Sequence, residues 1–379
     1  MTNPAIDSRL DGAGTPGLER NAWQGLESET GPFVHWDFLQ ALGDTGCTGG
    51  STGWHPEFFG VTREGTLQAA APGWLKYHSH GEFVFDWAWA RAAMQAGMAW
   101  YPKLLVAAPF TPVSGPRLLG AGPSRSDAER LLEQLEQSVE QRRLSSAGVN
   151  FCTDDDAGIL RAAGWLERFD WQFHWRNEGY RDFDDFLDRF RRKPRKNLRA
   201  ERRKVSDQGW HFIWKTGAEL DQGEIDLVHR CYLSTFQLYG NRPSLNREFF
   251  AAAAALAEPQ LLVCLACRDD QALAAAVFWR DRHRLYGRYW GSMVDARDVH
   301  FETCYYQGID YCIEHGLQWF EPGAQGEHKI RRGFLPQRTR SFHYIRSPAM
   351  RSAIRRYLQA EGEALTAYRD DLEGLNPFA

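Results

Sequence analysis

The sequence lacks the features that mark several common classes of protein. Its 379 residues contain no apolar run long enough to span a membrane, and residues 1–20 are polar, without the apolar core of a signal peptide. The formal net charge is only −4, which excludes the bulk positive charge that binds nucleic acids or membranes non-specifically. We therefore expect a cytoplasmic protein without integral membrane association.

Cysteine patterns and catalytic signatures are also sparse. The seven Cys residues are scattered and mostly have apolar neighbours, which favours buried thiols in a reducing compartment. Cys264 and Cys267 form a C-x-x-C pair, but no second pair of ligands follows it. No nucleophile elbow, P-loop, H-E-x-x-H or zinc-ligand spacing occurs. We expect no metal and no tightly bound cofactor.

The composition is that of a globular protein, and the length suggests two domains. The two halves of the chain share one order of predicted elements: helices, antiparallel strands, a strand–helix–strand unit and a closing strand. In the first half we predict strands at 58–62, 67–74, 83–86, 103–110, 149–152 and 172–175, with helices at 124–143 and 154–163. In the second half we predict helices at 194–206, 224–238, 301–315 and 349–372, and strands at 261–267, 272–280, 284–289, 318–321 and 341–345.

This repeated order is typical of acetyltransferase-type units. It predicts an α/β (α+β) fold with tandem GNAT-like domains, the acyl-CoA N-acyltransferase type. We expect a flexible N-terminal tail over residues 1–25, an N-terminal domain over 26–178, and a C-terminal domain over 179–379 that contains a basic helix at 194–206.

The segment from Arg189 to Lys204 is strongly basic, with ten Lys or Arg residues against one acid. On a helix, several of these cations lie on one side. An anionic partner explains such a concentration: the phosphates of a CoA-type donor, the acceptor end of a tRNA, or a phospholipid-linked precursor. The alternative is a solvated face that acids elsewhere neutralise. The candidate phosphate ligands are Arg192, Lys193, Arg195, Lys196 and Arg199.

A second candidate phosphate site begins at Arg117. Residues 117–122 match the R-x-x-G-x-G spacing with which acetyltransferases wrap backbone N–H groups around a pyrophosphate. However, Pro123 removes one amide, and an ordinary Gly-rich turn between a strand and a helix has the same pattern.

Residues 321–334 form a polar loop after a buried strand, where α/β folds commonly place chemistry. Glu327 or His328 is a candidate to remove the proton from an acceptor amine, which acyl transfer requires. Gln325, Lys329 and Arg331 are candidates to hold a developing oxyanion or a substrate phosphate. The alternative is a loop that is merely solvated.

Other candidates lie on neighbouring predicted elements. In the second half, Glu302 is a further catalytic candidate, and the substrate-binding candidates are Arg288, Tyr289, Trp290 and Tyr306. In the first half the substrate-binding candidates are His78, Asp86, Lys103 and Thr111. For each of these residues alone, a partly buried aromatic, a satisfied core histidine or a cap is the alternative.

Four runs, at 74–87, 109–117, 286–291 and 323–329, resemble a bacterial family whose members are labelled GNAT family N-acetyltransferase or peptidoglycan biosynthesis/recognition protein. In addition, residues 193–199 resemble the basic helix of the Fem aminoacyltransferases. The resemblance implies two GNAT-like domains and transfer of an aminoacyl group from tRNA to a cell-wall precursor.

Two functions follow as alternatives. The first is an acyltransferase or aminoacyltransferase that forms an amide bond from acyl-CoA or aminoacyl-tRNA to an amine acceptor, either of cell-wall type or a small molecule. The second is a non-catalytic recognition protein that keeps the transferase fold and binds an anionic ligand. The sequence does not indicate the oligomeric state.

Overall fold

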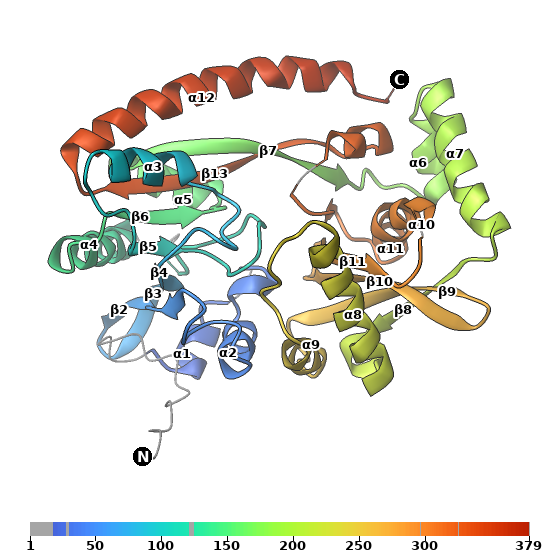
Figure 1. The fold of residues 1–379 in the computed structure, drawn as a ribbon, viewed down its shortest axis with the longest axis horizontal. Helices are drawn as coiled ribbons and strands as arrows, with labels where there is room; N and C mark the ends of the chain where they lie inside the picture. Colours follow the sequence, from blue (N-terminus) through green and yellow to red (C-terminus); the bar gives the residue numbers. More distant parts are fainter. Residues whose placement is uncertain (1–17, 28–29, 121–124, 296, 325, 379) are drawn as a thin grey trace. The chain divides into compact units, whose positions relative to one another are not determined.

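The computed structural model describes residues 18–27, 30–120, 125–295, 297–324 and 326–378 (Figure 1). The chain divides into two compact units. Unit 1 comprises Met1–Phe169 and Thr339–Gly362, and unit 2 comprises Asp170–Arg338 and Glu363–Ala379. Within the described ranges, no helix combines the length and the hydropathy needed to cross a membrane.

The sheet of unit 1 has the strand order β1-β4-β5-β6-β13. Its strands are β1 (Trp54–Pro56), β4 (Gly73–Lys76), β5 (Lys103–Val106), β6 (Ser146–Asn150) and β13 (Leu335–Ile345). A separate hairpin is formed by β2 (Phe59–Arg63) and β3 (Thr66–Ala71). Strands β5 and β6 are parallel, and the other neighbours in this sheet are antiparallel.

Helices pack against this sheet and supply part of its core. They are η1 (Pro32–Val34), α1 (Arg20–Gln24), α2 (Trp36–Asp44), α3 (Trp87–Gln95), α4 (Arg125–Gln141) and α5 (Asp154–Ala162). Helix α4 makes the crossover that a parallel strand pair requires. Its apolar repeat, which includes Leu131, Leu135 and Val139, is buried in the unit 1 core.

Two predictions for unit 1 were wrong. Residues 1–17 of the expected tail lie outside the described residues, but Arg20–Gln24 form α1, because Trp23 is fully buried and donates to the Val34 carbonyl at 3.0 Å. Residues 83–86 alternate in burial as a strand would, yet they form an irregular loop. The left-handed φ of 58° at Phe83 interrupts any ladder there.

The sheet of unit 2 has the strand order β7-β12-β11-β10-β9-β8. Its strands are β7 (Leu166–Arg176), β8 (His211–Thr216), β9 (Gln260–Arg268), β10 (Gln271–Arg280), β11 (Arg284–Ser292) and β12 (Trp319–Glu321). Here β11 and β12 are parallel. Their crossover consists of α10 (Arg297–Phe301), a π-helical segment η3 (Glu302–Tyr306) and α11 (Gln307–Glu314).

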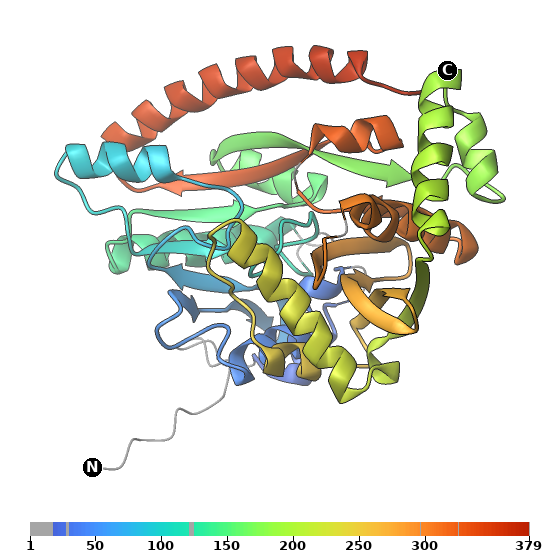
Figure 2. The same ribbon diagram turned by 45° about the vertical axis from the view of Figure 1, so that its right-hand side comes forward.

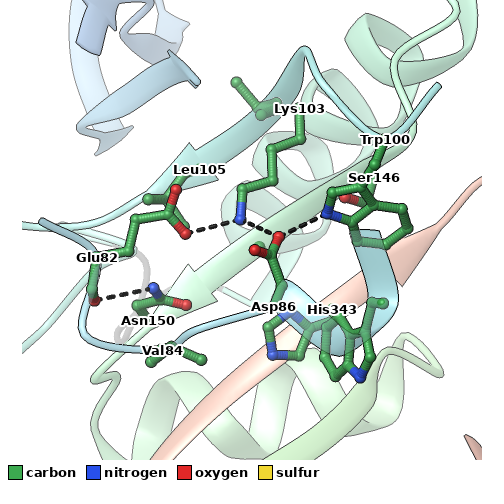
Figure 3. Close-up of a pocket in the computed structure, with 12 residues that line it drawn as sticks. Glu82, Val84, Asp86, Trp100, Lys103, Leu105, Ser146, Asn150 and His343 are labelled. Atoms are coloured by element: carbon green, nitrogen blue, oxygen red, sulfur yellow. Dashed lines mark hydrogen bonds and ion pairs between the residues drawn. The ribbon is translucent and has the colours of Figure 1, made fainter. Parts of the chain in front are cut away.

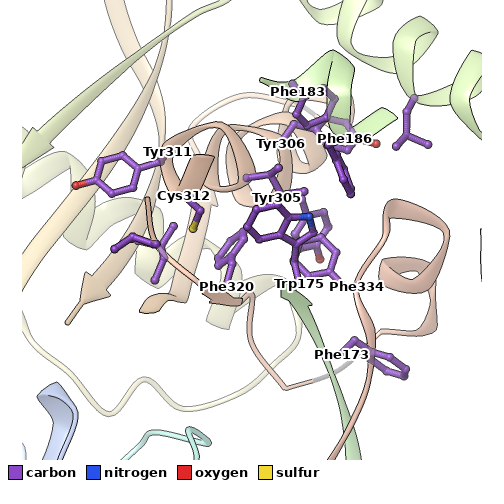
Figure 4. Close-up of a cluster of buried hydrophobic side chains, with 14 of the residues drawn as sticks. Phe173, Trp175, Phe183, Phe186, Tyr305, Tyr306, Tyr311, Cys312, Phe320 and Phe334 are labelled. Carbon is purple, nitrogen blue, oxygen red and sulfur yellow. The ribbon is translucent and has the colours of Figure 1, made fainter. Parts of the chain in front are cut away.

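The remaining helices of unit 2 are α6 (Phe183–Asp188), α7 (Arg192–Asp207), η2 (Gly217–Glu219), α8 (Gln222–Leu238), α9 (Arg247–Ala254) and η4 (Glu327–Arg332). Helices α6 and α7 lie side by side (Figures 1 and 2). The core is aromatic, and Figure 4 shows Trp175, Phe320 and Phe334 packed beneath Tyr305.

Helix α7 corresponds to the predicted basic helix, and it begins two residues earlier than predicted.

Each unit is closed by a strand from a distant part of the chain. In unit 1, β6 pairs with residues 341–345 of β13, and in unit 2, β12 pairs with the end of β7. Strands β7 and β13 and helix α12 (Pro348–Gly374) therefore contain residues of both units. The structure thus does not divide into the two contiguous stretches, 26–178 and 179–379, that we expected.

Gly291 on β11 lies directly beneath α8, where a Cβ would stand 1.7 Å from the Cys231 carbonyl oxygen. We predict that Gly291→Ala lowers the free energy of unfolding by about 3 kcal/mol, since the strand or the helix must shift. At the exposed Gly158 of α5 nothing lies within 4 Å of a new Cβ. Gly158→Ala should therefore stabilise the protein by about 0.5–1 kcal/mol. Urea denaturation followed by circular dichroism checks both, and a wild-type midpoint for Gly291→Ala would contradict this close approach.

Candidate active site

A π-helical segment interrupts the crossover helix of unit 2 at Glu302–Tyr306. Such insertions are frequent at functional sites because they alter the directions of neighbouring side chains. Here the two adjacent tyrosines reach different partners. The Tyr305 hydroxyl lies 3.0 Å from Nε2 of His328, and the Tyr306 hydroxyl donates to Glu201 of α7.

The loop that follows β12 depends on two glycines. Gly323 and Gly326 have φ values of 98° and 115°, which side chains rarely adopt. At Gly326 a Cβ would lie 2.4 Å from Cε1 of His328, so glycine leaves the space that the imidazole occupies. The Gly323 carbonyl accepts a hydrogen bond from Lys329 Nζ at 2.7 Å.

His328 is exposed, although buried groups hold it on one side. Desolvation, followed by the positive charges of Arg332 and Lys329, lowers the pKa of His328 below its ordinary value. The imidazole is therefore neutral at physiological pH and has a nitrogen that can accept a proton. Burial raises the pKa of Tyr305, so its hydroxyl remains protonated.

Lys329 is almost completely buried. Desolvation lowers the pKa of its ammonium group to about 7. Among the described residues, no carboxylate lies within ion-pair distance of Nζ, and the Gly323 carbonyl is its hydrogen-bond acceptor. A lysine in this environment changes charge near neutral pH, which is a property of many functional lysines.

Arg332 connects the loop with the helices around it. Its guanidinium donates to the Tyr306 hydroxyl at 3.0 Å, the His328 carbonyl at 3.0 Å and Glu201 at 2.9 Å. The same group lies 3.6 Å from the centre of the Phe301 ring. The backbone of His328 is therefore held by a buried, fully engaged arginine.

Glu302, which we expected to be a catalytic residue, is buried in an ion pair. Arg202 of α7 donates to it at 2.9 Å and also to Asp310 at 2.7 Å, and Gln307 donates to it at 2.9 Å. Burial raises the pKa of Glu302, and Arg202 opposes this effect. Because these partners occupy the carboxylate, its geometry is that of a group that positions α7 against the π-helical segment.

The other predicted loop residues differ in their surroundings. Glu327 is exposed and accepts a hydrogen bond from Tyr368, and Arg331 is also exposed. Gln325 lies outside the described residues. The structure therefore brings His328 and Lys329 together with Tyr305 and Arg332, whereas Glu327 faces away toward α12.

The three predicted residues of β11 separate according to strand alternation. Trp290 lies on the side of the π-helical segment, with its ring 5.5 Å from that of His300. Tyr289 is half-buried, and its ring lies 5.0 Å from the Tyr232 ring of α8. The Arg288 guanidinium lies 5.3 Å from the Tyr289 ring.

Helix α7 contains two kinds of cation. Arg195 pairs with Asp188 at 2.8 Å and Arg199 with Asp184 at 2.9 Å, so acids of α6 neutralise part of the helix. A second set is exposed and has no acidic partner among the described residues, namely Arg192, Lys193, Lys196 and Arg203. Three of these, Arg192, Lys196 and Arg203, lie opposite the buried Leu198 and Val205, and we call them the α7 cation row.

The predicted phosphate site at Arg117 has a different geometry from the one expected. The Arg117 side chain is buried and donates to the carbonyls of Asn150 at 3.0 Å and Val113 at 2.6 Å. Residues 121–124 of the Gly-rich turn lie outside the described residues. A guanidinium used in this way stabilises the loop and is not free to bind a phosphate.

Of the other candidates in unit 1, Thr111 is buried and donates to the Pro109 carbonyl at 2.9 Å. His78 Nε2 lies 2.9 Å from the Thr52 carbonyl. Asp86 and Lys103 belong to a buried network, in which Lys103 Nζ lies 2.5 Å from Asp86 and 2.7 Å from Glu82 (Figure 3).

Sequence reasoning missed the links that hold these residues. Glu201 and Arg202 lie about 100 residues or more from their partners Arg332 and Glu302 in the chain, and no local pattern connects them. The adjacent residues Glu201 and Arg202 both contact the π-helical segment. An acid beside an arginine in an otherwise basic helix is the feature of the sequence that could have indicated these contacts.

The repeated topology and the loop site define a protein built from two GNAT-like units, which confirms the predicted α/β (α+β) fold. Residues 16–379 match the FemAB-like family, described as peptidoglycan biosynthesis/recognition, and the chain belongs to that family. The family resemblance inferred from the sequence is thus confirmed.

Solved structures share this fold at low sequence identity. FemX has a TM-score of 0.57 at 12% identity, covering 89% of this chain and 98% of that chain. The C-terminal domain (DUF2156) of a putative lysylphosphatidylglycerol synthetase from Agrobacterium fabrum has a TM-score of 0.54 at 11% identity, covering 89% and 96%. L-PGS from Bacillus licheniformis has a TM-score of 0.52 at 11% identity, covering 89% and 94%. A sequence search of curated proteins gave no match.

The buried Lys329 makes stability depend on pH. Its pKa is about 7 in the folded state and 10.5 in the unfolded chain, so the unfolded state binds more protons between these values and stability rises with pH. We predict that Lys329→Met removes a slope of about 1.4 kcal/mol per pH unit from this range. Urea denaturation between pH 7.5 and about 10 measures the slope.

The matched control is His328→Gln, because the pKa of His328 is lowered and its imidazole is already neutral in this range. Its slope should equal that of the wild type. An unchanged slope in Lys329→Met would show that Lys329 is not buried as described.

Proposed function

We propose that this chain is an amide-forming acyltransferase or aminoacyltransferase. The observation that carries the proposal is the exposed, neutral imidazole of His328, which Tyr305 and Gly326 hold beside the buried Lys329. A transferase that uses an amine acceptor needs a base of this kind, because an ammonium group has no lone pair with which to attack. Membership of a peptidoglycan biosynthesis/recognition family supports the proposal.

The reaction balances without a metal or redox partner. His328 takes a proton from the acceptor ammonium and releases it to solvent, and the amine nitrogen then attacks the carbonyl carbon of the donor. A C–N bond forms, and the C–S bond of a thioester or the C–O bond of an aminoacyl ester breaks. The second proton that the attacking nitrogen loses passes through His328 to the leaving group. Lys329 in its protonated form and the exposed Arg331 are the candidates to stabilise the developing oxyanion.

The α7 cation row is the proposed contact for the phosphates of the donor. Acyl-CoA and aminoacyl-tRNA both present phosphates, and either serves as a co-substrate. The acceptor is an amine, of cell-wall type or a small molecule. Glu302 and Glu201 act as positioning residues in this proposal, because they hold α7 and the loop through Arg202 and Arg332.

The donor contact is tested by removing the α7 cation row. We predict that Arg192→Ala, Lys196→Ala and Arg203→Ala together weaken donor binding about tenfold or more and reduce its salt dependence, since charge-assisted contacts are lost. The control removes three exposed arginines of unit 1, Arg125, Arg161 and Arg355, which alters the net charge equally. Thermal shifts with CoA, acetyl-CoA and aminoacyl-tRNA at two salt concentrations measure binding. Equal binding by both triple variants would contradict a donor site on α7.

The base is tested with two variants that act on the same imidazole. We predict that His328→Gln lowers turnover about 10²–10⁴-fold with the fold intact. Gly326→Ala should lower it in the same direction, because a methyl group there displaces the ring. His315→Gln, an exposed histidine of the same unit, is the control and should keep full turnover.

The assay presents a donor panel and mixed primary amines, and mass spectrometry detects the amide. Full activity in His328→Gln would remove this residue from the mechanism. Binding of a donor or of an anionic cell-wall precursor without any product would favour the non-catalytic recognition protein instead.

A further inference from the structure

Unit 1 contains a polar cavity of about 10 Å³, a volume suited to one water-sized group. Ser146, Gly148 and Asn150 border it from alternate positions of β6, which lie on one face of the sheet. Gly148 contributes to the space, since a Cβ there would stand 3.3 Å from Leu105. Figure 3 shows the carboxylates of Glu82 and Asp86 directed toward Lys103 beside this face.

Two buried oxygens at this cavity have no hydrogen-bond partner among the described residues. They are Oε1 of Glu82 and Oδ1 of Asn150, and both side chains border the cavity. The two residues are also neighbours, because Asn150 Nδ2 donates to the Glu82 carbonyl at 3.5 Å. Leaving such acceptors unpaired in the interior destabilises the protein. A bound group that donates hydrogen bonds to them would remove this destabilisation.

The donors around these oxygens are already engaged elsewhere. Lys103 donates to the other oxygen of Glu82 and to Asp86, while Trp100 and Tyr101 donate to Asp86 at 2.6 and 2.8 Å. Lys76 donates to the His80 carbonyl, and its Nζ remains 4.0 Å from Glu82 Oε1. These side chains therefore leave Glu82 Oε1 and Asn150 Oδ1 as acceptors for a bound group that donates.

The backbone at both acceptors is strained. Phe83 and Phe151, which directly follow Glu82 and Asn150, have φ values of 58° and 53°. Bulky residues rarely adopt this region, and such strain concentrates at binding and catalytic sites. Gly81 is required beside them, because a Cβ there would lie 2.5 Å from the Phe110 ring.

The charged groups around the cavity can accommodate a positive ligand. Glu82 and Asp86 are the acids, and Lys103 and the more distant Lys76 are the cations. Burial lowers the pKa of His343 to about 3, so its imidazole is neutral, and burial lowers the pKa of Lys76 to about 7, so this lysine is charged only in part. Burial raises the pKa of Glu82 to about 7 as well, and a bound cation would favour the ionised form of this carboxyl.

We propose that this cavity of unit 1 is a binding site for an ammonium group, either the free ion or the tip of a primary amine, which donates to Glu82 Oε1 and Asn150 Oδ1. An ammonium group is about the size of water, carries at least three N–H donors and brings the charge that the carboxylates favour. The site needs no acyl donor, so it stands or falls separately from the proposed transfer reaction.

The test compares four chloride salts at equal ionic strength on the full-length wild-type protein. Ammonium and methylammonium have N–H donors, whereas tetramethylammonium and sodium do not. We expect the first two to raise the melting temperature with a saturable concentration dependence, and the other two to give only a common salt effect. Identical curves for all four salts would overturn the proposal and leave water as the occupant.

Two variants test whether the stabilisation by ammonium compounds arises at this cavity. Glu82→Gln and, separately, Asn150→Ala should raise the apparent Kd for methylammonium about tenfold or more, because a charge-assisted or buried hydrogen bond is lost. Glu129→Gln, an exposed carboxylate of α4 in the same unit, is the matched control and should keep the wild-type Kd. A wild-type Kd in both cavity variants would overturn the assignment, and the wild-type salt comparison stands even where a variant does not fold.

Discussion

The parallel pairing of β11 with β12 is the constraint on which the candidate active site depends. Two parallel neighbours cannot be joined by a tight turn, so the chain must leave the sheet and return through a helix. That crossover contains the π-helical segment with Tyr305 and Tyr306. When β12 ends at Glu321, its loop begins beside the crossover, and His328 meets Tyr305 there.

Charge pairing then fixes the loop and α7 as one assembly. Glu201 and Arg202 are adjacent on α7, and they bind groups of opposite sign, Arg332 of the loop and Glu302 of the π-helical segment. One partner of each pair is buried, Arg332 in the first and Glu302 in the second, so separating the elements would leave a buried charge without its partner. His328 and the α7 cation row are therefore held on the same framework within unit 2.

Much of the fold followed from the sequence, because local patterns determine it. The basic helix at 194–206 and the crossover around 301–315 have helical periodicity, and the strands within 261–280 are continuous apolar runs. The exchanged closing strands had no such signal, since nothing near residues 341–345 indicates a partner at 146–150. The loop at 83–86 misled for the opposite reason: its alternation is real, but a left-handed Phe83 turns it into a loop.

The residues of the candidate site could be predicted from the sequence about as far as the fold could. The dense polar loop indicated His328 and Lys329, yet their chemistry comes from contacts that only the folded chain provides. Lys329 is buried with no carboxylate at ion-pair distance among the residues that the structure describes, whereas Lys103 of unit 1 is buried between two carboxylates. Sequence composition cannot distinguish these lysines, and the difference decides which one changes charge near neutral pH.

The two units share a topology, but unit 1 has buried acceptors that need a donor, and unit 2 has a buried donor that needs an acceptor. In unit 1 the parallel pair β5 and β6 supports buried acceptors that lack a donor, at Glu82 and Asn150. In unit 2 the loop after the parallel pair contains a buried donor, Lys329, with no carboxylate at ion-pair distance within the described part of the chain. Stability alone selects against both arrangements, because each leaves a polar group short of partners in the interior. The ammonium group proposed for unit 1 and the oxyanion of the reaction proposed for unit 2 would each supply the partner that these groups need.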